Sequence, residues 1–364
     1  MVPDVKSSRS SGDDTVRAFA PGRLNLIGEH TDYNDGLALP FAVTLGVVVT
    51  ATRLPGDTVQ ALAGDLGETD AFPLHSPQPA DGWRAFVRGA VAEITRLGYA
   101  LPAARIEISG EVPRGSGLSS SAALEVALCL ALIELAGAAP PPDVELARLG
   151  QRIEHDWAGA QTGLLDQLAS LSGAAGQAVL IDFRTLEIEP LPLELGEHLL
   201  VTLPSGEPHA NAESGYNRRR EECFEAAQRV GAESLRDAQI QDLHMLPDVL
   251  ARRARHVISE NGRVLEAVAA LRRRDFQRLG RLLDLSHASL RDDFEVSTPA
   301  VEAAVGRLKE AGALGARLLG GGFGGSVLGL MAPSTDVLTD ATMVSPGPGA
   351  HLLRTPAGSS LQRG

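Results

Sequence analysis

Lysine, cysteine and long apolar runs are scarce in this sequence, and each scarcity excludes a class of protein. The only lysines are Lys6 and Lys309, and neither follows a glycine-rich loop, so the common GxxxxGK[ST] phosphate loop is absent. Two cysteines, Cys129 and Cys223, are too few for a structural zinc site or a disulfide framework. The most apolar segment, residues 122–139, contains two glutamates, which argues against a membrane span.

Positive charge is scarce as well, since the formal net charge is -13 at pH 7. Binding along a nucleic-acid backbone requires basic surface, so nucleic acid is not expected as a main partner. A nucleotide is not excluded, because local N–H groups and a metal ion can hold its phosphates. Residues 1–14 are polar, lack the apolar core of a signal peptide and are predicted to be disordered. These features predict a cytoplasmic protein that does not associate with membranes.

The length of 364 residues favours about two domains. Residues 179–183 and 199–203 are predicted strands, and we interpret the link between them, residues 184–197, as a domain junction. The predicted division is therefore an N-terminal domain over residues 15–190 and a C-terminal domain over residues 191–364, which ends in an irregular tail.

The sequence PRGSGLSSSAA, residues 113–123, is the most informative stretch. It follows an alternating segment typical of a strand, residues 105–110, and leads into the helical pattern of residues 122–139. A loop at a helix N-terminus presents free N–H groups and the positive end of the helix dipole, and glycines allow a ligand to approach closely. This pattern indicates an anion site, most plausibly for a phosphate. The alternative is a flexible turn with a serine N-cap.

A second polar segment lies near the N-terminus. We predict a strand over residues 16–20, a turn at residues 21–22 and a second short strand over residues 23–27. The next nine residues contain seven polar side chains, among them Glu29, His30 and Asp32, and such a loop suits a polyhydroxylated ligand. The alternative is a solvated loop around an Asn-Asp-Gly turn.

Two carboxylates further along the chain are candidates for chemistry. Glu154 lies near the end of a predicted helix over residues 143–157, and Asp166 lies among leucines. In that apolar setting Asp166 is either desolvated and reactive or tied into hydrogen bonds. The glycine-containing segment between Glu154 and Asp166 would let both approach one cation, or the two are unrelated carboxylates at element ends.

Three other features complete the interpretation. Trp83 begins a helix predicted over residues 83–97 and is either core or a platform for a ligand. Tyr216 is predicted to lie in a polar loop, where it is a ligand candidate, and residues 286–297 are predicted to form another polar loop. Residues 314–330 contain too many glycines for ordinary helix or strand, so the backbone must pass close to a ligand or another strand.

Taken together, these stretches resemble the GHMP small-molecule kinases and, within them, the galactokinase family. The residues that carry the resemblance are PGRLNLIGEHTDYNDGLALP (21–40), PRGSGLSSSAALEVA (113–127) and LLGGGFGGSVLGL (318–330), supported by WRAFVRG, GLLDQ and SHASLRDDFEVSTP. The resemblance covers about residues 16–330, and the Glu-His-Thr-Asp-Tyr run is specific to the galactokinase branch. It implies an α+β fold of two domains with the active site in the cleft between them.

The resemblance also implies an activity, ATP-dependent phosphorylation of α-D-galactose at its C1 hydroxyl to give galactose 1-phosphate and ADP, which opens galactose breakdown. Asp166 would be the catalytic aspartate, as a base or only as a positioning group, with Arg23 beside it to stabilise charge on the transferring group. For the sugar, the resemblance implies Arg23, Glu29, His30, Asp32, Gly163, Asp166 and Tyr216. For ATP it implies Trp83, Gly115, Ser116, Gly117, Leu118, Ser119, Ser120 and Ser121. For Mg²⁺ it implies Ser121 and Glu154.

Two rival functions and three departures accompany this prediction. The rivals are a kinase for a related sugar, such as arabinose or N-acetylgalactosamine, and a non-catalytic sugar sensor on the same fold. The departures are Ser326 where the family has cysteine, Asn34-Asp35-Gly36 where it has Asn-Gly-Gly, and a short Pro/Gly-rich segment after Leu330. The expected partners are small-molecule substrates alone, and a monomer is expected.

Overall fold

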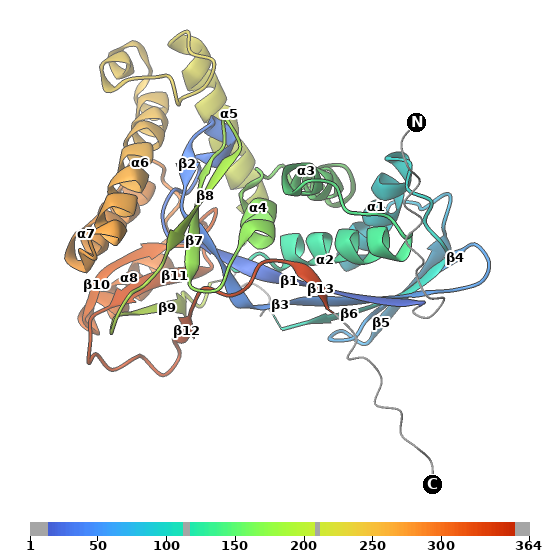
Figure 1. Ribbon diagram of the computed structural model, residues 1–364. Coiled ribbons are helices and arrows are strands. Elements are labelled where there is room, and N and C mark those ends of the chain that lie inside the picture. Colours follow the sequence, from blue (N-terminus) through green and yellow to red (C-terminus); the bar gives the residue numbers. More distant parts are fainter. Residues whose placement is uncertain (1–13, 112–116, 208–211, 354–364) are drawn as a thin grey trace, which may run out of the picture.

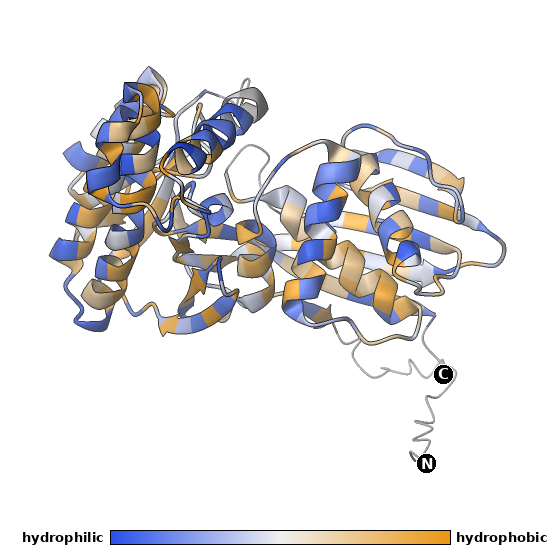
Figure 2. Ribbon diagram, turned by 90° about the horizontal axis from the view of Figure 1, so that it is seen from above, coloured by the Kyte–Doolittle hydropathy of each residue, from blue (hydrophilic) through white to orange (hydrophobic). Residues whose placement is uncertain are grey.

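The computed structural model describes residues 14–111, 117–207 and 212–353 and consists of two lobes (Figures 1 and 2). The first lobe is built on a six-stranded sheet and the second on a four-stranded sheet, with a three-stranded sheet beside them. Helices and mostly antiparallel strands are mixed in both lobes, as expected for the α+β class.

The six-stranded sheet supports the first lobe. Its strands, in spatial order, are β13 (His351–Leu353), β1 (Thr15–Asn25), β3 (Pro40–Arg53), β6 (Ala104–Gly110), β4 (Thr58–Ala63) and β5 (Glu68–Pro73). All neighbours pair antiparallel except β4 and β6, which pair parallel. The strand predicted over residues 105–110 is therefore confirmed.

The turn predicted at residues 21–22 is wrong, because β1 continues through it. The pairing of β1 with β3 shifts its register between Pro21 and Arg23 instead of ending. Proline has no N–H to donate to the hydrogen-bond ladder of the sheet, so it is compatible with an irregularity of this kind. The Pro21 carbonyl accepts a hydrogen bond from Ser170 Oγ. The irregularity lies directly before Arg23.

Helix α2 (Ser120–Leu135) is buried on nearly all sides between the sheet and three other helices. These helices are α1 (Trp83–Arg96), α3 (Asp143–Ile153) and α4 (Leu165–Ser172), with a short π-helical turn η2 (Glu154–Ala158) after α3. A helix that is apolar all round belongs in a core, and Cys129 is fully buried there. Figure 1 shows α2 lying across one face of the sheet.

The second lobe is a sheet covered by long helices. The sheet has the order β10 (Ala313–Leu318), β11 (Ser326–Met331), β9 (Leu199–Pro204) and β12 (Thr342–Val344), and the helices are α5 (Ala212–Arg229), α6 (Asp248–Arg272), α7 (Phe276–Asp292) and α8 (Pro299–Glu310), with a 3-10 turn η3 (Ile240–Met245) before α6. Figure 2 shows polar and apolar bands side by side on the helices, as expected for helices with one buried face. None of the helices within the described ranges combines the length and hydrophobicity that a bilayer-spanning segment needs.

The loop predicted over residues 286–297 is wrong for its first half, because α7 extends to Asp292. Two of its serines, Ser286 and Ser289, are buried and hydrogen-bonded to the neighbouring helix α6. Ser286 Oγ donates to Glu260 Oε1 at 2.7 Å, and Ser289 Oγ lies 3.0 Å from His256 Nδ1. Polarity here reflects a buried network rather than exposure to solvent.

The link between the lobes contains a small sheet. Its strands are β2 (Leu37–Ala38), β7 (Gln177–Asp182) and β8 (Glu187–Pro192), and a 3-10 turn η1 (Asp32–Asn34) precedes β2. The chain later returns to the first lobe, since β13 near its end pairs with β1. The division at residue 190 thus remains a prediction, and of the stretch predicted to be disordered, residues 1–13 lie outside the described residues.

Candidate active site

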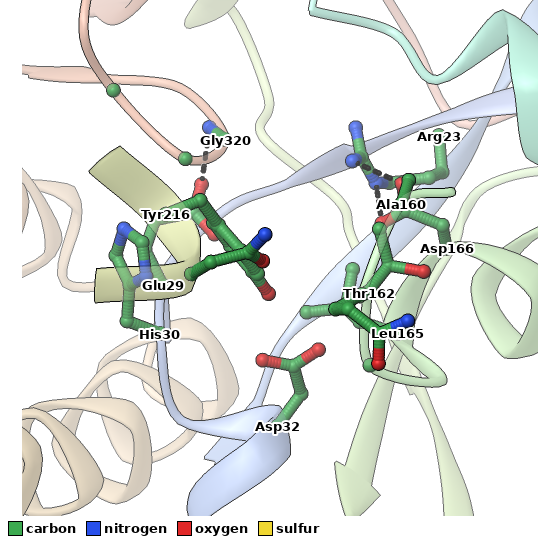
Figure 3. A pocket seen from close by; sticks show the side chains of 15 residues that line it. Arg23, Glu29, His30, Asp32, Ala160, Thr162, Leu165, Asp166, Tyr216 and Gly320 are labelled. Atoms are coloured by element: carbon green, nitrogen blue, oxygen red, sulfur yellow. Dashed lines mark hydrogen bonds and ion pairs between the residues drawn. The ribbon is translucent and has the colours of Figure 1, made fainter. Parts of the chain in front are cut away.

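One pocket between the lobes is lined by all of the residues assigned to a sugar (Figure 3). Figure 3 shows Arg23 and Asp166 on one side, Glu29, His30 and Tyr216 on the other, and Asp32 below them. The complete lining is Arg23, Glu29, His30, Asp32, Ala160, Gln161, Thr162, Gly163, Leu165, Asp166, Tyr216, Asn217, Gly320, Gly321 and Gly322. It combines β1, the loop of residues 28–37 (here the sugar loop), the segment before α4, helix α5 and the glycine-rich turn between β10 and β11.

Arg23 and Asp166 form a two-point ion pair in the wall of this pocket. Arg23 Nε donates to Asp166 Oδ1 and Nη2 donates to Oδ2, each at 2.6 Å. Ser119 Oγ donates to the same Oδ2 at 2.5 Å. Of the two alternatives for Asp166, the carboxylate is therefore tied into hydrogen bonds, and a planar guanidinium fixes its orientation.

Arg23 also joins this carboxylate to the segment before α2. Its Nη1 donates to the carbonyl of Gly117 at 2.7 Å, and its backbone N–H donates to the carbonyl of Leu118 at 3.0 Å. Burial opposes the charged form of Arg23, but the Asp166 carboxylate more than compensates and raises the pKa of Arg23 above its ordinary value. The guanidinium is a permanent cation at the junction of the two segments.

Glu29 is held by both lobes. In the first lobe Asn25 Nδ2 donates to Glu29 Oε2 at 2.6 Å. From the second lobe the N–H of Gly320 donates to Oε1 at 2.9 Å, and Nη2 of the fully buried Arg317 lies 2.9 Å from the same oxygen. The glycine-rich turn therefore comes close to the sugar loop, which fits the close approach predicted from its composition.

His30 is buried among aromatic rings and stays neutral. Its Nδ1 lies 2.8 Å from the hydroxyl of Tyr33, and its ring centre lies 4.6 Å from that of Phe294 and 5.3 Å from that of Tyr216. Burial, with a contribution from His256, lowers the pKa of His30 to about 3. A neutral imidazole with a fixed Nδ1 can offer Nε2 to a ligand in the pocket.

Asp32 and Gly163 face each other at very short range. A Cβ atom on Gly163 would lie 1.7 Å from Asp32 Oδ2, so no other residue fits at position 163 without movement. Burial, together with the charge of Asp166, raises the pKa of Asp32 to about 7. A carboxyl group in this state can accept a hydrogen bond or donate one near neutral pH.

Tyr216 lies in helix α5 and not in a loop, so that part of the prediction is wrong, although its ring does line the pocket. The helix comes close to the glycine-rich turn, where a Cβ atom on Gly215 would lie 2.5 Å from the ring of Phe323. Burial raises the pKa of Tyr216 well above its ordinary value, which keeps the phenol protonated and able to donate a hydrogen bond.

The candidates for ATP lie in two places. Trp83, Ser120 and Ser121 line a second pocket over α1 and the start of α2, where Trp83 Nε1 donates to Glu68 Oε2 at 2.9 Å. Gly117, Leu118 and Ser119 lie beside Arg23 and Asp166, and Gly115 and Ser116 lie outside the described residues. Ser119 stands at the N-cap position of α2 without a capping bond from its side chain, so the serine N-cap alternative is wrong for it.

Glu154 belongs to a buried acidic group under the start of α2. Gln167 Nε2 donates to Glu154 Oε2 and to Glu125 Oε2, each at 3.0 Å, and Thr162 Oγ1 donates to Glu154. Burial raises the pKa of Glu154, whereas the hydroxyls of Thr162 and Ser121 act to lower it. Within the described ranges no three acidic, histidine or cysteine side chains gather as a preformed metal site. The hydroxyl and carboxylate oxygens of Ser121 and Glu154 are nevertheless hard ligands of the kind that Mg²⁺ accepts.

Several contributors to the site had no signal in the sequence. The bond from Ser119 to Asp166 joins residues 47 positions apart, and the buried Arg317 resembles any other arginine until it is placed. Thr162, which lines the sugar pocket and bonds to Glu154, lies in a segment that was noted only for its glycines.

Three segments that together make up more than half of the chain match known protein families. Residues 8–53 match the galactokinase galactose-binding signature, residues 85–174 match the GHMP kinases N terminal domain, and residues 267–342 match the GHMP kinases C terminal domain. The first and last of these segments contain the polar loop and the glycine-rich turn that meet at Glu29.

Individual relatives agree with the family matches. The chain is 40% identical over 314 residues to a galactokinase of Thermotoga neapolitana, covering 86% of this chain and 88% of the relative. It is 42% identical over 324 residues to a galactokinase of Mycobacterium tuberculosis, covering 87% and 89%.

Solved structures agree as well. The structure of Lactococcus lactis galactokinase complexed with galactose aligns with a TM-score of 0.86 and 32% identity over 93% of this chain and 95% of that one. Mevalonate kinase of Methanococcus jannaschii, at 16% identity and a TM-score of 0.61 over 93% and 99%, shares the fold. The chain therefore belongs to the galactokinase family of GHMP kinases and is an ATP-dependent sugar kinase.

Proposed function

We propose that galactose binds in the pocket between the lobes and that the chain transfers the γ-phosphoryl group of ATP to its C1 hydroxyl. The observation that carries this proposal is the convergence of seven sugar candidates, from four separate segments, on one pocket whose wall contains the Arg23–Asp166 pair. Carboxylates, a neutral imidazole and a phenol together supply the acceptors and donors that sugar hydroxyls require.

Asp166 is proposed as the group that receives the reacting hydroxyl. An ionised carboxylate offers about four lone-pair positions. Among the described residues, Oδ2 of Asp166 accepts from Arg23 and Ser119, whereas Oδ1 accepts from Arg23 alone. The remaining position on Oδ1 is the proposed acceptor for the C1 hydroxyl, which would orient that oxygen for in-line attack and take its proton early or late.

Arg23 is proposed to hold Asp166 and to stabilise charge on the transferring group. Phosphoryl transfer depends on positioning and charge neutralisation more than on covalent steps. Ser119 to Ser121 and Gly117 lie at the start of α2, and their neighbours Gly115 and Ser116 complete the segment proposed to hold the ATP phosphates, with Trp83 near the adenine. Ser121 and Glu154 are proposed ligands for Mg²⁺, which supplies charge neutralisation on the phosphates.

Asp166→Asn tests the assignment, with Asp156→Asn on the exposed surface of the neighbouring turn η2 as the matched control. ADP release would be measured with ATP and Mg²⁺ against galactose, glucose, N-acetylgalactosamine and arabinose. We expect turnover on galactose, loss of turnover in Asp166→Asn with ATP binding retained, and no change in Asp156→Asn. Unchanged turnover in Asp166→Asn would overturn the catalytic assignment, and turnover on another sugar alone would overturn the substrate assignment.

We also propose that the chain acts as a monomer in the cytoplasm. The seven sugar candidates of a single chain converge on one pocket, which supports a monomer. Both cysteines are free thiols buried in the core, which suits a reducing compartment. Light scattering of the purified protein tests the first statement, and fractionation of cells tests the second.

A further inference from the structure

The sugar loop belongs to the first lobe by sequence, yet helix α6 of the second lobe holds both of its ends. At the start of the loop the N–H of Gly28 donates to Glu260 Oε1 at 3.0 Å. At its end the N–H of Leu37 donates to Asn261 Oδ1 at 2.8 Å. Two adjacent residues of one helix therefore accept the backbone N–H groups that bound the loop.

A third contact lies next to the first, at Glu29. Nε2 of His256, one turn earlier on α6, donates to the carbonyl of Glu29 at 3.1 Å. Glu260 is itself fixed, because it is fully buried and accepts from Arg263 Nε at 2.6 Å and from Ser286 Oγ at 2.7 Å. The Glu260 carboxylate is thus held in place by contacts within the second lobe as well as by the loop.

The fit between the loop and the helix is also tight. A Cβ atom on Gly36 would lie 2.7 Å from Asn261 Oδ1 and 2.6 Å from Thr31 Cβ. Inside the loop, Thr31 Oγ1 lies 2.8 Å from the carbonyls of both Gly28 and Leu37, so the two ends are tied to each other as well. The loop has little freedom to shift while these contacts are intact.

We propose that Asn261 and Glu260 are positioning residues for sugar recognition, through which the second lobe sets the affinity for galactose. Neither residue lines the sugar pocket, but Glu29, His30 and Asp32 all lie between the two anchored ends. Releasing an end lets these three side chains leave the geometry that the sugar requires. The inference rests on the proposed assignment of Glu29, His30 and Asp32 to the sugar.

Asn261→Ala provides the test, because it removes the acceptor for the N–H of Leu37 without adding atoms. We expect the KM for galactose to rise about fivefold, as for the loss of one hydrogen bond to a backbone amide, while the KM for ATP stays unchanged. Asn261→Asp keeps an oxygen acceptor at the same position and should restore the KM for galactose. Leu265→Ala, at an exposed side chain one turn further along α6, is the matched control.

A purely structural role for Asn261 would change both KM values or only the melting temperature, so thermal unfolding is measured on every variant. The inference is overturned if Asn261→Ala leaves the KM for galactose unchanged, raises the KM for ATP equally, or is not rescued by Asn261→Asp. Asp32→Asn changes a proposed sugar contact directly and separates the two failures. If Asp32→Asn raises the KM for galactose and Asn261→Ala does not, only the inference about α6 fails. If neither variant raises the KM for galactose, the assignment of Asp32 to the sugar fails as well.

Discussion

The contact between Gly163 and Asp32 gives the sharpest test of the sugar pocket. In Gly163→Ala the new Cβ atom would lie 1.7 Å from Asp32 Oδ2 and 2.5 Å from its Cγ. Ordinary contact begins at 3.4 Å, so one of the two groups must move by about 1.7 Å. The backbone at Gly163 does not require a positive φ, so the substitution adds no other strain.

A displacement of this size exceeds the 1 Å at which misplacement costs about 10²-fold in rate, so we expect kcat/KM for galactose to fall about 10²-fold. The KM for ATP should stay the same, because the three heavy atoms nearest to the new Cβ all belong to Asp32, a proposed sugar residue. The assay is steady-state ADP release with each substrate varied in turn. Gly306→Ala on α8, where a Cβ atom would meet nothing within 4 Å, is the control and should match the wild type. An unchanged KM and kcat for galactose in Gly163→Ala would refute the placement of Asp32 against the sugar.

Three further predictions concern the charged and polar wall of the pocket. Arg23→Lys loses the two-point pair with Asp166 and should lower kcat about 10²-fold even though the charge is kept, which a turnover assay at saturating substrates would detect. Ser119→Ala removes a donor to Asp166 Oδ2 and should lower kcat about tenfold in a turnover assay at saturating substrates. Because the pKa of Asp32 rises to about 7 from an ordinary 3.8, the folded protein keeps a proton that the unfolded chain releases, so the free energy of unfolding should fall as pH rises from about 4 to 7. In Asp32→Asn the melting temperature should lose this part of its pH dependence.

The sequence was sufficient to predict which polar side chains and glycines come together, and most of the elements around them. The run around Glu29, His30 and Asp32 combined polar groups that an exposed loop does not need, and the structure brings all three into one pocket. The glycine-rich stretch that holds Gly320 predicted a close approach, and its N–H donates to Glu29. These predictions succeeded because each rests on a local property, either the chemistry of a side chain or the freedom of a glycine.

The errors arose in segments whose secondary structure depends on burial in the folded protein and not on the local sequence pattern. Ser286 and Ser289 made residues 286–297 resemble a loop, but both side chains bond to α6 inside the second lobe. Tyr216 was placed in a loop for the same reason, since its neighbours in α5 are polar, but Arg219 among them is buried and donates to the carbonyl of Phe294. The sequence does not distinguish a polar residue that is buried and hydrogen-bonded from a polar residue that is exposed to solvent. The two differ only in the hydrogen-bond partner, which lies far away in the chain.

The contacts of Arg23 predict that substitutions near the proposed ATP site and near the proposed sugar site will have different kinetic effects. Its side chain binds Asp166 in the pocket between the lobes and the Gly117 carbonyl before α2, so one cation joins the proposed sugar and ATP sites. Glu29, in contrast, is tied to Asn25 and to the N–H of Gly320, and no described contact of its side chain reaches the start of α2. Changes on the Glu29 side should therefore alter the KM for galactose alone, whereas changes at Arg23 should lower kcat and disturb ATP as well. An Arg23 variant that altered only the KM for galactose would show that this junction does not couple the two sites.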